Sequence, residues 1–98
     1  MDKVYIPTNK GIKEVMVQNI IRVEASSNYC KIYFANEYPL TVAKVLQWFE
    51  DTLPEDFFCR IHRTHLVNRG FISSVSGDFK LTLCNGEQFK VSRRKKRA

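Results

Sequence analysis

The sequence has no long apolar run and only three cysteines among its 98 residues. No segment approaches the ~20 consecutive apolar residues of a membrane-spanning helix, and the start MDKVYIPTNK lacks the apolar core of a signal peptide. The cysteines, Cys30, Cys59 and Cys84, are odd in number and widely spaced, which argues against a disulfide framework and favours a reducing compartment. These absences predict a cytoplasmic protein that does not enter a membrane.

Acidic residues are absent from two stretches, residues 57–77 and residues 90–98. The second stretch holds six of the sixteen Lys and Arg residues, so residues 1–89 carry ten basic and ten acidic residues. Four of these acids lie just before the first stretch, between Glu50 and Asp56. A solubilising tail would explain residues 90–98 but not the middle of the chain. The segregation therefore predicts a positive region that attracts a polyanion, most simply nucleic acid.

Length and composition predict one globular domain, residues 1–98, with a basic tail at residues 93–98. One helix is predicted at residues 42–53, with Thr41 as its N-cap and Pro54 after its end. Its apolar stripe is Val42, Val45, Leu46, Phe49 and Leu53. Alternating β-branched and aromatic residues predict a mainly β architecture, with strands within residues 3–7, 12–17, 19–26, 29–34 and 58–61 and three more within residues 71–92.

The Asn85-Gly86 pair predicts a turn between the last two strands. A two-residue turn would place Leu81 opposite Lys90, with apolar and polar side chains on one face. A three-residue loop, Cys84–Gly86, with Gly86 in the left-handed conformation, pairs Leu81 with Phe89 instead. We expect this second register, which also pairs Phe79 with Val91 and turns inward Phe79, Leu81, Leu83, Phe89 and Val91.

The residues give little support to catalysis or metal binding. His62-Arg63-Thr64 matches a His-x-Thr element that some phosphoesterases use in two copies, but this chain has one copy. Cys59, His62 and His65 could approach a zinc ion if their segment were helical, but no second close pair of ligands accompanies them. The prediction is therefore no enzyme, no metal and no cofactor.

Nucleic-acid binding accounts for the same residues more simply. Arg presents a planar fork of donors that fits phosphate or the edge of guanine, and Lys supplies a mobile charge. Hydroxyl and amide side chains complete phosphate contacts. All of these occur in residues 26–31, 62–64 and 92–96, which are loops or strand ends.

Two segments of the chain resemble the LytTR family, a family of DNA-binding domains attached to many bacterial response regulators. These segments are FFCRIHRTHLVN at residues 57–68 and LTLCNGEQFKVSRR at residues 81–94. The family's central pattern is F-x-R-I-H-R-S-x-x-V-N, and its C-terminal pattern is N-G-x-x-x-x-V-S-R-R. The segment IIRVEASSNYCKIYF at residues 20–34 is similar to the family's early strand-loop-strand. The resemblance covers nearly the whole chain.

The resemblance implies an elongated fold of about ten short strands in small antiparallel sheets with one short helix. It also implies that loops enter successive major grooves of duplex DNA. Cys30 stands where the family has a base-reading residue, although a thiol is a weak hydrogen-bond partner. Arg94 is the best candidate for a guanine contact, and Arg63 is expected to bind a base or a phosphate. The full set of implied contacts is Asn28, Tyr29, Cys30, Lys31, Arg63, Thr64, Arg69, Ser92, Arg93, Arg94 and Lys95.

Other residues of the central motif have structural interpretations. His62 and Asn68 are expected to bond backbone in an irregular turn. Arg60 and Arg69 are expected either to contact phosphate or to pair with the acids of residues 50–56.

The function predicted from these residues is sequence-specific binding of double-stranded DNA in transcription regulation. The resemblance further implies a two-component system, two copies on repeated sites, and a receiver or sensor domain outside this chain. A protein-interaction or signal-coupling module with an incidental basic tail is the alternative. Binding of single-stranded RNA, with Tyr29 and Tyr33 stacking on bases, is a third hypothesis.

Overall fold

The computed structural model describes residues 2–92, and within them it shows a mainly β protein. The strands are β1 (Lys3–Thr8), β2 (Gly11–Met16), β3 (Ile20–Ser26), β4 (Tyr29–Phe34), β5 (Leu40–Val42), β6 (Phe58–His62), β7 (His65–Asn68), β8 (Ile72–Val75), β9 (Lys80–Leu83) and β10 (Gln88–Lys90). The helices are one α-helix, α1 (Leu46–Thr52), and two 3-10 turns, η1 (Val17–Asn19) and η2 (Arg69–Phe71). The predicted fold class is confirmed.

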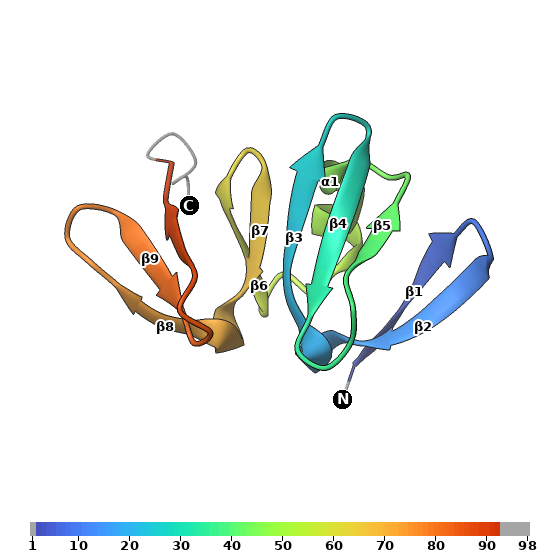
Figure 1. The fold of residues 1–98 in the computed structure, drawn as a ribbon, viewed down its shortest axis with the longest axis horizontal. Helices are drawn as coiled ribbons and strands as arrows, with labels where there is room; N and C mark the ends of the chain where they lie inside the picture. Colours follow the sequence, from blue (N-terminus) through green and yellow to red (C-terminus); the bar gives the residue numbers. More distant parts are fainter. Residues whose placement is uncertain (1, 93–98) are drawn as a thin grey trace.

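The strands form three antiparallel sheets arranged along an elongated molecule. A central sheet has the order β5-β4-β3-β7-β6, a two-stranded sheet joins β1 to β2, and a C-terminal sheet has the order β10-β9-β8. Figure 1 shows β1 and β2 at one end of the long axis and the C-terminal sheet at the other. The described part of the chain measures 42 × 25 × 22 Å.

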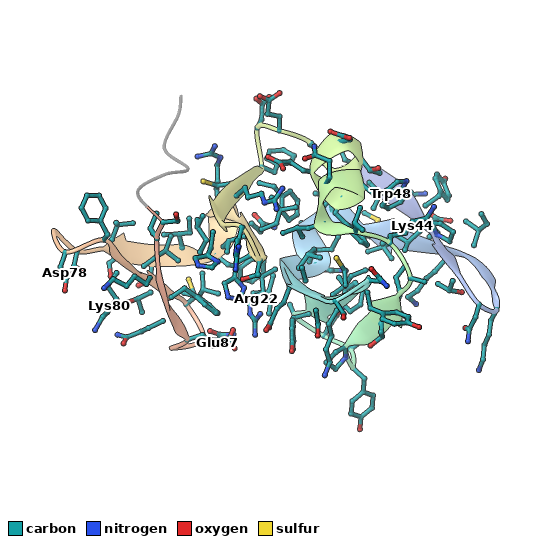
Figure 2. The ribbon with its side chains drawn as sticks, turned by 90° about the horizontal axis from the view of Figure 1, so that it is seen from above. Arg22, Lys44, Trp48, Asp78, Lys80 and Glu87 are labelled. Atoms are coloured by element: carbon teal, nitrogen blue, oxygen red, sulfur yellow. The ribbon has the colours of Figure 1, made fainter. Side chains whose placement is uncertain are left out.

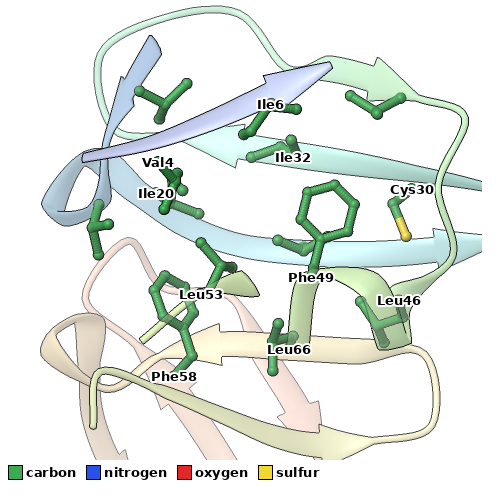
Figure 3. Close-up of a cluster of buried hydrophobic side chains, with 14 of the residues drawn as sticks. Val4, Ile6, Ile20, Cys30, Ile32, Leu46, Phe49, Leu53, Phe58 and Leu66 are labelled. Atoms are coloured by element: carbon green, nitrogen blue, oxygen red, sulfur yellow. The ribbon is translucent and has the colours of Figure 1, made fainter. Parts of the chain in front are cut away.

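The larger of two apolar cores lies between one face of the central sheet, α1 and the β1–β2 hairpin (Figure 3). Val4 and Ile6 point inward from alternate positions of β1, as the two-residue period of a strand requires. From α1 the side chains of Leu46 and Phe49 enter this large core, and Leu53 follows at the end of the helix. The other buried members are Val15, Val17, Ile20, Val23, Cys30, Ile32, Phe34, Val42, Phe58 and Leu66.

The smaller core lies between the central sheet and the C-terminal sheet. Its buried members are Ile61 and Val67 from β6 and β7, and Leu81 and Leu83 from β9. Because Leu66 faces the large core and Val67 the small one, β7 is covered on both faces. The partly buried residues around the small core are Ile21, Cys59, Ile72, Phe89 and Val91.

The helix α1 is shorter than the sequence predicts, and the predicted start of the helix is wrong. Residues Leu40–Val42 form β5, in which Thr41 pairs with Lys31 of β4, so Thr41 is not an N-cap. Val45 takes the N-cap position with an extended backbone and is 54% exposed, although it was expected on the buried stripe. Hydrogen bonds to β4 therefore override the helical spacing of residues 42–45. Among the described residues no helix is long and apolar enough to cross a membrane.

The C-terminal hairpin has the predicted register. Leu81 pairs with Phe89, Gly86 has φ 93°, and the Val91 N–H donates to the Phe79 carbonyl at 2.8 Å. Phe79 itself does not point inward as expected: it is 38% exposed and has φ 62°. It belongs to the turn before β9 rather than to the strand, so the alternation that orients Leu81 and Leu83 does not extend to it.

Candidate nucleic-acid interface

Three segments that are far apart in the sequence meet at one edge of the molecule. They are the β3–β4 turn with the first residue of β4 (residues 27–29), the β6–β7 turn (residues 63–64) and the chain after β10 (residues 91–92), and together we call them the loop edge. Figure 1 shows all three at the upper side of the molecule. Two backbone hydrogen bonds link segments to neighbouring strands: Ala25 of β3 donates to the Thr64 carbonyl at 2.9 Å, and Ser92 donates to the carbonyl of Ile61 in β6 at 2.7 Å.

The first segment is a tight hairpin turn with exposed side chains. Ser26 pairs with Tyr29, so only Ser27 and Asn28 lie in the turn. Ser27 has φ 59°, at a turn position that normally favours glycine. Asn28 and Lys31 are exposed, and Tyr29 exposes 52% of its surface. A short turn of this kind has little freedom, so it presents these side chains in a defined arrangement.

Cys30 does not belong to the exposed set. Its side chain has no exposed surface and packs in the large core, where Cys30 pairs with Val42 of β5. Burial raises the pKa of this thiol, with the charge of Arg60 opposing, so it is neutral at physiological pH. The expectation that the Cys30 side chain reads a base is therefore wrong, because the alternation of β4 turns Tyr29 and Lys31 outward and Cys30 inward.

The second segment, the β6–β7 turn, is held by hydrogen bonds to two side chains, those of His62 and Arg60. The Thr64 N–H donates to His62 Nδ1 at 3.2 Å, and the Thr64 Oγ1 lies 3.0 Å from the same nitrogen. Arg60 donates from Nη2 to the Arg63 carbonyl at 2.7 Å and from Nη1 to Glu50 Oε1 at 2.8 Å. These contacts confirm the structural interpretation of His62 and the pairing of Arg60 with an acid.

Arg63 projects from this braced turn. Its side chain is exposed, and within residues 2–92 it forms no ion pair. The half-buried Thr64 instead directs its hydroxyl toward His62. The turn therefore offers one cationic fork to a partner, with Thr64 beside it.

Asn68 and Arg69 lie at the other end of β7 from this turn. Asn68 is buried, where its Nδ2 donates to the Ile20 carbonyl at 2.9 Å and its Oδ1 accepts the Gly70 N–H at 2.8 Å. This confirms its structural interpretation. Arg69 follows it in η2 and is exposed. Four strand residues separate Arg69 from the β6–β7 turn, about 13 Å of chain, so the structure does not bring Arg69 together with the other predicted contacts.

The third segment ends with the described residues. Ser92 is half-buried at the loop edge, next to β6 through its bond to Ile61. The predicted contacts Arg93, Arg94 and Lys95 lie outside the described residues.

The sequence prediction missed Lys44 as a candidate contact. Val42 pairs with Cys30, one residue beyond the β3–β4 turn, so Lys44 lies at the same end of the central sheet as that turn. Its ammonium group is 5.3 Å from the centre of the Trp48 ring, and Figure 2 labels both residues. The helical pattern hid Lys44 inside a predicted helix, and only the pairing of β5 reveals its position.

Comparisons with known proteins identify the family of this chain. The model of the LytTr DNA-binding domain family matches residues 10–98. The Sensory transduction protein LytR of Streptococcus mutans is 37% identical over 57 residues, which are 54% of this chain and 23% of that protein. The match thus spans about a quarter of that relative's length.

The fold is similar to a solved structure as well. A LytTr DNA-binding domain from Bacillus cereus superposes with a TM-score of 0.78 at 31% identity, over 96% of this chain and 89% of that one. The LytTR resemblance of the central and C-terminal motifs is thereby confirmed. The chain belongs to the LytTR family, whose domains bind DNA and act in transcription regulation.

Proposed function

We propose that the loop edge binds double-stranded DNA sequence-specifically, with its three segments entering successive major grooves. The observation that carries this proposal is the meeting of residues 27–29, 63–64 and 91–92 along one side of an elongated β framework. A loop fits a groove when a rigid scaffold presents it. The protein would act by docking rather than by catalysis.

The shape of the two described turns supports binding with a small entropic cost. The β3–β4 turn has two residues, and the β6–β7 turn is held by His62 and Arg60. Loops that already have their bound conformation lose little freedom when a complex forms. This rigidity favours discrimination between DNA sequences over loose adhesion to any polyanion.

The candidate contacts divide into two proposed roles. Arg63 and Arg94 can each donate two hydrogen bonds to guanine, and Tyr29 can contact a base edge with its ring or hydroxyl. Asn28, Lys31, Lys44, Thr64, Ser92, Arg93 and Lys95 are proposed to contact phosphates, which set position rather than sequence. Because Lys and Arg release counterions when they bind phosphate, affinity should fall steeply with salt.

The proposed unit is residues 1–98, acting as one DNA-binding domain with a basic tail at residues 93–98. In a bacterial response regulator a receiver domain would control it, and two copies would occupy repeated sites on the duplex. Two copies on one DNA raise the effective concentration of each other, so modest single-site affinity would suffice.

The test starts with selection of bound fragments from a random duplex pool, followed by comparison of two arginine variants. Arg63→Ala should weaken binding to the selected duplex by ~1–3 kcal/mol more than binding to unrelated DNA. Arg69→Ala removes the same charge from an exposed site at the other end of β7, and it should cost little on both DNAs. Fluorescence anisotropy at fixed salt measures the six affinities, those of the unmodified protein and of the two variants on each of the two DNAs. Equal losses for the two variants on both DNAs would contradict the proposed role of the loop edge.

A further inference from the structure

A charge network around one buried arginine joins the central sheet to the C-terminal sheet. Arg22 of β3 donates from Nε to Glu87 Oε1 at 3.1 Å and from Nη2 to Glu87 Oε2 at 3.0 Å. Its Nη1 donates to Glu24 Oε1 at 2.8 Å. The guanidinium lies 3.9 Å from the centre of the Tyr33 ring and 4.9 Å from that of Phe89. Figure 2 shows Arg22 and Glu87 side by side, and we call these five residues the Arg22 clasp.

The clasp buries the charged side chain of Arg22 at a position that an apolar side chain could occupy. The Arg22 side chain is 6% exposed, whereas those of Glu24 and Glu87 are each 39% exposed. Buried ion pairs often stabilise no better than well-packed apolar residues of similar size, because both charges lose hydration. A bidentate arginine–carboxylate pair does, however, impose one distance and one orientation on its partners. The clasp therefore fixes the distance and orientation of its partners, in addition to any stability that it contributes.

From the clasp, two chain segments lead to the loop edge. From Arg22, β3 continues through four more residues to Ser26, at the β3–β4 turn. From Glu87 the chain continues through β10 to Ser92, five residues on. At about 3.3 Å per residue these segments are about 13–17 Å long, so a rotation of about 10° at the clasp would move a loop by about 2–3 Å. Such a displacement is as long as a hydrogen bond.

We infer that the Arg22 clasp is a positioning element for DNA recognition, which sets the third loop against the first two without touching DNA. This inference rests on the proposed function of the loop edge. The small core alone has four buried residues, and the clasp adds an oriented contact on its border through Phe89. The third segment, residues 91–92, would then meet the correct groove only when Glu87 is held by Arg22.

The test uses the full chain and a matched pair of glutamate variants. Glu87→Gln removes one negative charge from the clasp, and Glu14→Gln removes one from the exposed pair of Glu14 with Lys3, 2.9 Å apart in the β1–β2 hairpin. A third variant, Arg22→Lys, keeps the net charge and removes the forked guanidinium group. Binding to the selected and to an unrelated duplex is measured at a temperature where circular dichroism shows all variants folded.

Glu87→Gln and Arg22→Lys should lower the preference for the selected duplex about tenfold, while Glu14→Gln keeps it. Repeating the random-pool selection with Glu87→Gln should return a site that keeps the base pairs read by the first two loops and loses those read by the third. A purely structural role would reduce binding to every duplex alike, and that outcome, or an unchanged site, overturns the inference. Wild-type protein without sequence preference would instead refute the proposed function itself.

Discussion

The two faces of the central sheet are covered in different ways. Among residues 2–92, the core toward α1 and the β1–β2 hairpin contains fifteen buried apolar residues, whereas the core toward the C-terminal sheet contains four. Beside those four lies the Arg22 clasp, with one buried guanidinium between two carboxylates. The large-core side is held mainly by apolar area, and the other side, with its smaller core, depends more on oriented polar contacts.

The two cores therefore have different roles in the scaffold. Apolar burial is strong but not directional, so the large core makes a stable platform for β3, β4 and α1. Hydrogen-bonded charges contribute less net stability but define geometry, which suits a sheet that must be set at one angle. The C-terminal sheet should therefore be the part that opens first.

Truncation in the large core should have the largest effect. Phe49 is fully buried between α1 and the sheet, so Phe49→Ala should lower the free energy of unfolding by ~3–5 kcal/mol. Urea titration followed by circular dichroism measures the change. Amide exchange should accelerate throughout the described strands, because the platform itself is weakened. A loss below about 1 kcal/mol would mean that the large core is not the main source of stability.

Truncation in the small core should cost less and act locally. Leu83 is 1% exposed in β9, and Leu83→Ala should lower the free energy of unfolding by about 2–3 kcal/mol. Hydrogen exchange should accelerate in β8, β9 and β10 while β3 and β4 keep the protection of the unmodified protein. Uniform acceleration in all strands would show that the two faces unfold as one unit and would remove the contrast drawn between them.

Acidification should have the smallest effect and should act on the small-core side. Burial lowers the pKa of His65, whose surroundings also include the charges of Glu24, Arg22, His62 and Glu87. Its Nδ1 is buried without a hydrogen-bond partner among the described residues. The native state therefore disfavours protonation, and stability that is complete above pH ~6.5 should fall as the pH drops below that value.

The free energy of unfolding, measured at about pH 7.5 and pH 5.5, tests this dependence. A variant of His65 is compared with a matched variant of His62. The decrease should disappear in His65→Gln and persist in His62→Gln. The hydrogen bond from Arg22 holds the pKa of Glu87 below its usual range, so loss of that stabilisation begins only below about pH 4.5. An unchanged decrease in His65→Gln would assign it to other groups.

Local sequence signals predicted most of the fold. Strand alternation located the hairpins, and the demand that Leu81 face an apolar partner selected the correct register around Gly86. The start of the helix could not be predicted in this way. Val42 and Val45 have helical spacing with Leu46, but residues 40–42 gain more by pairing with β4. Competition between a local and a distant partner is invisible in one stretch of sequence.

The candidate site was predicted in part. The turn at Arg63 and the structural roles of His62 and Asn68 followed from the central motif. The inward orientation of Cys30 could have been found from the apolar alternation of Cys30, Ile32 and Phe34. The separation of Arg69 from the loop edge and the position of Lys44 required the strand order, which joins β3 to β7 and β4 to β5.

The family, the β content and the residues able to bind a polyanion could be predicted from the sequence, because these depend on side-chain chemistry and on periodicity along the chain. Only the packing of the sheets places some of those residues on a shared edge. The same packing buries Arg22 against Glu87, 65 positions away. Contacts at such separations depend on how sheets pack over two cores, and no local pattern records that packing.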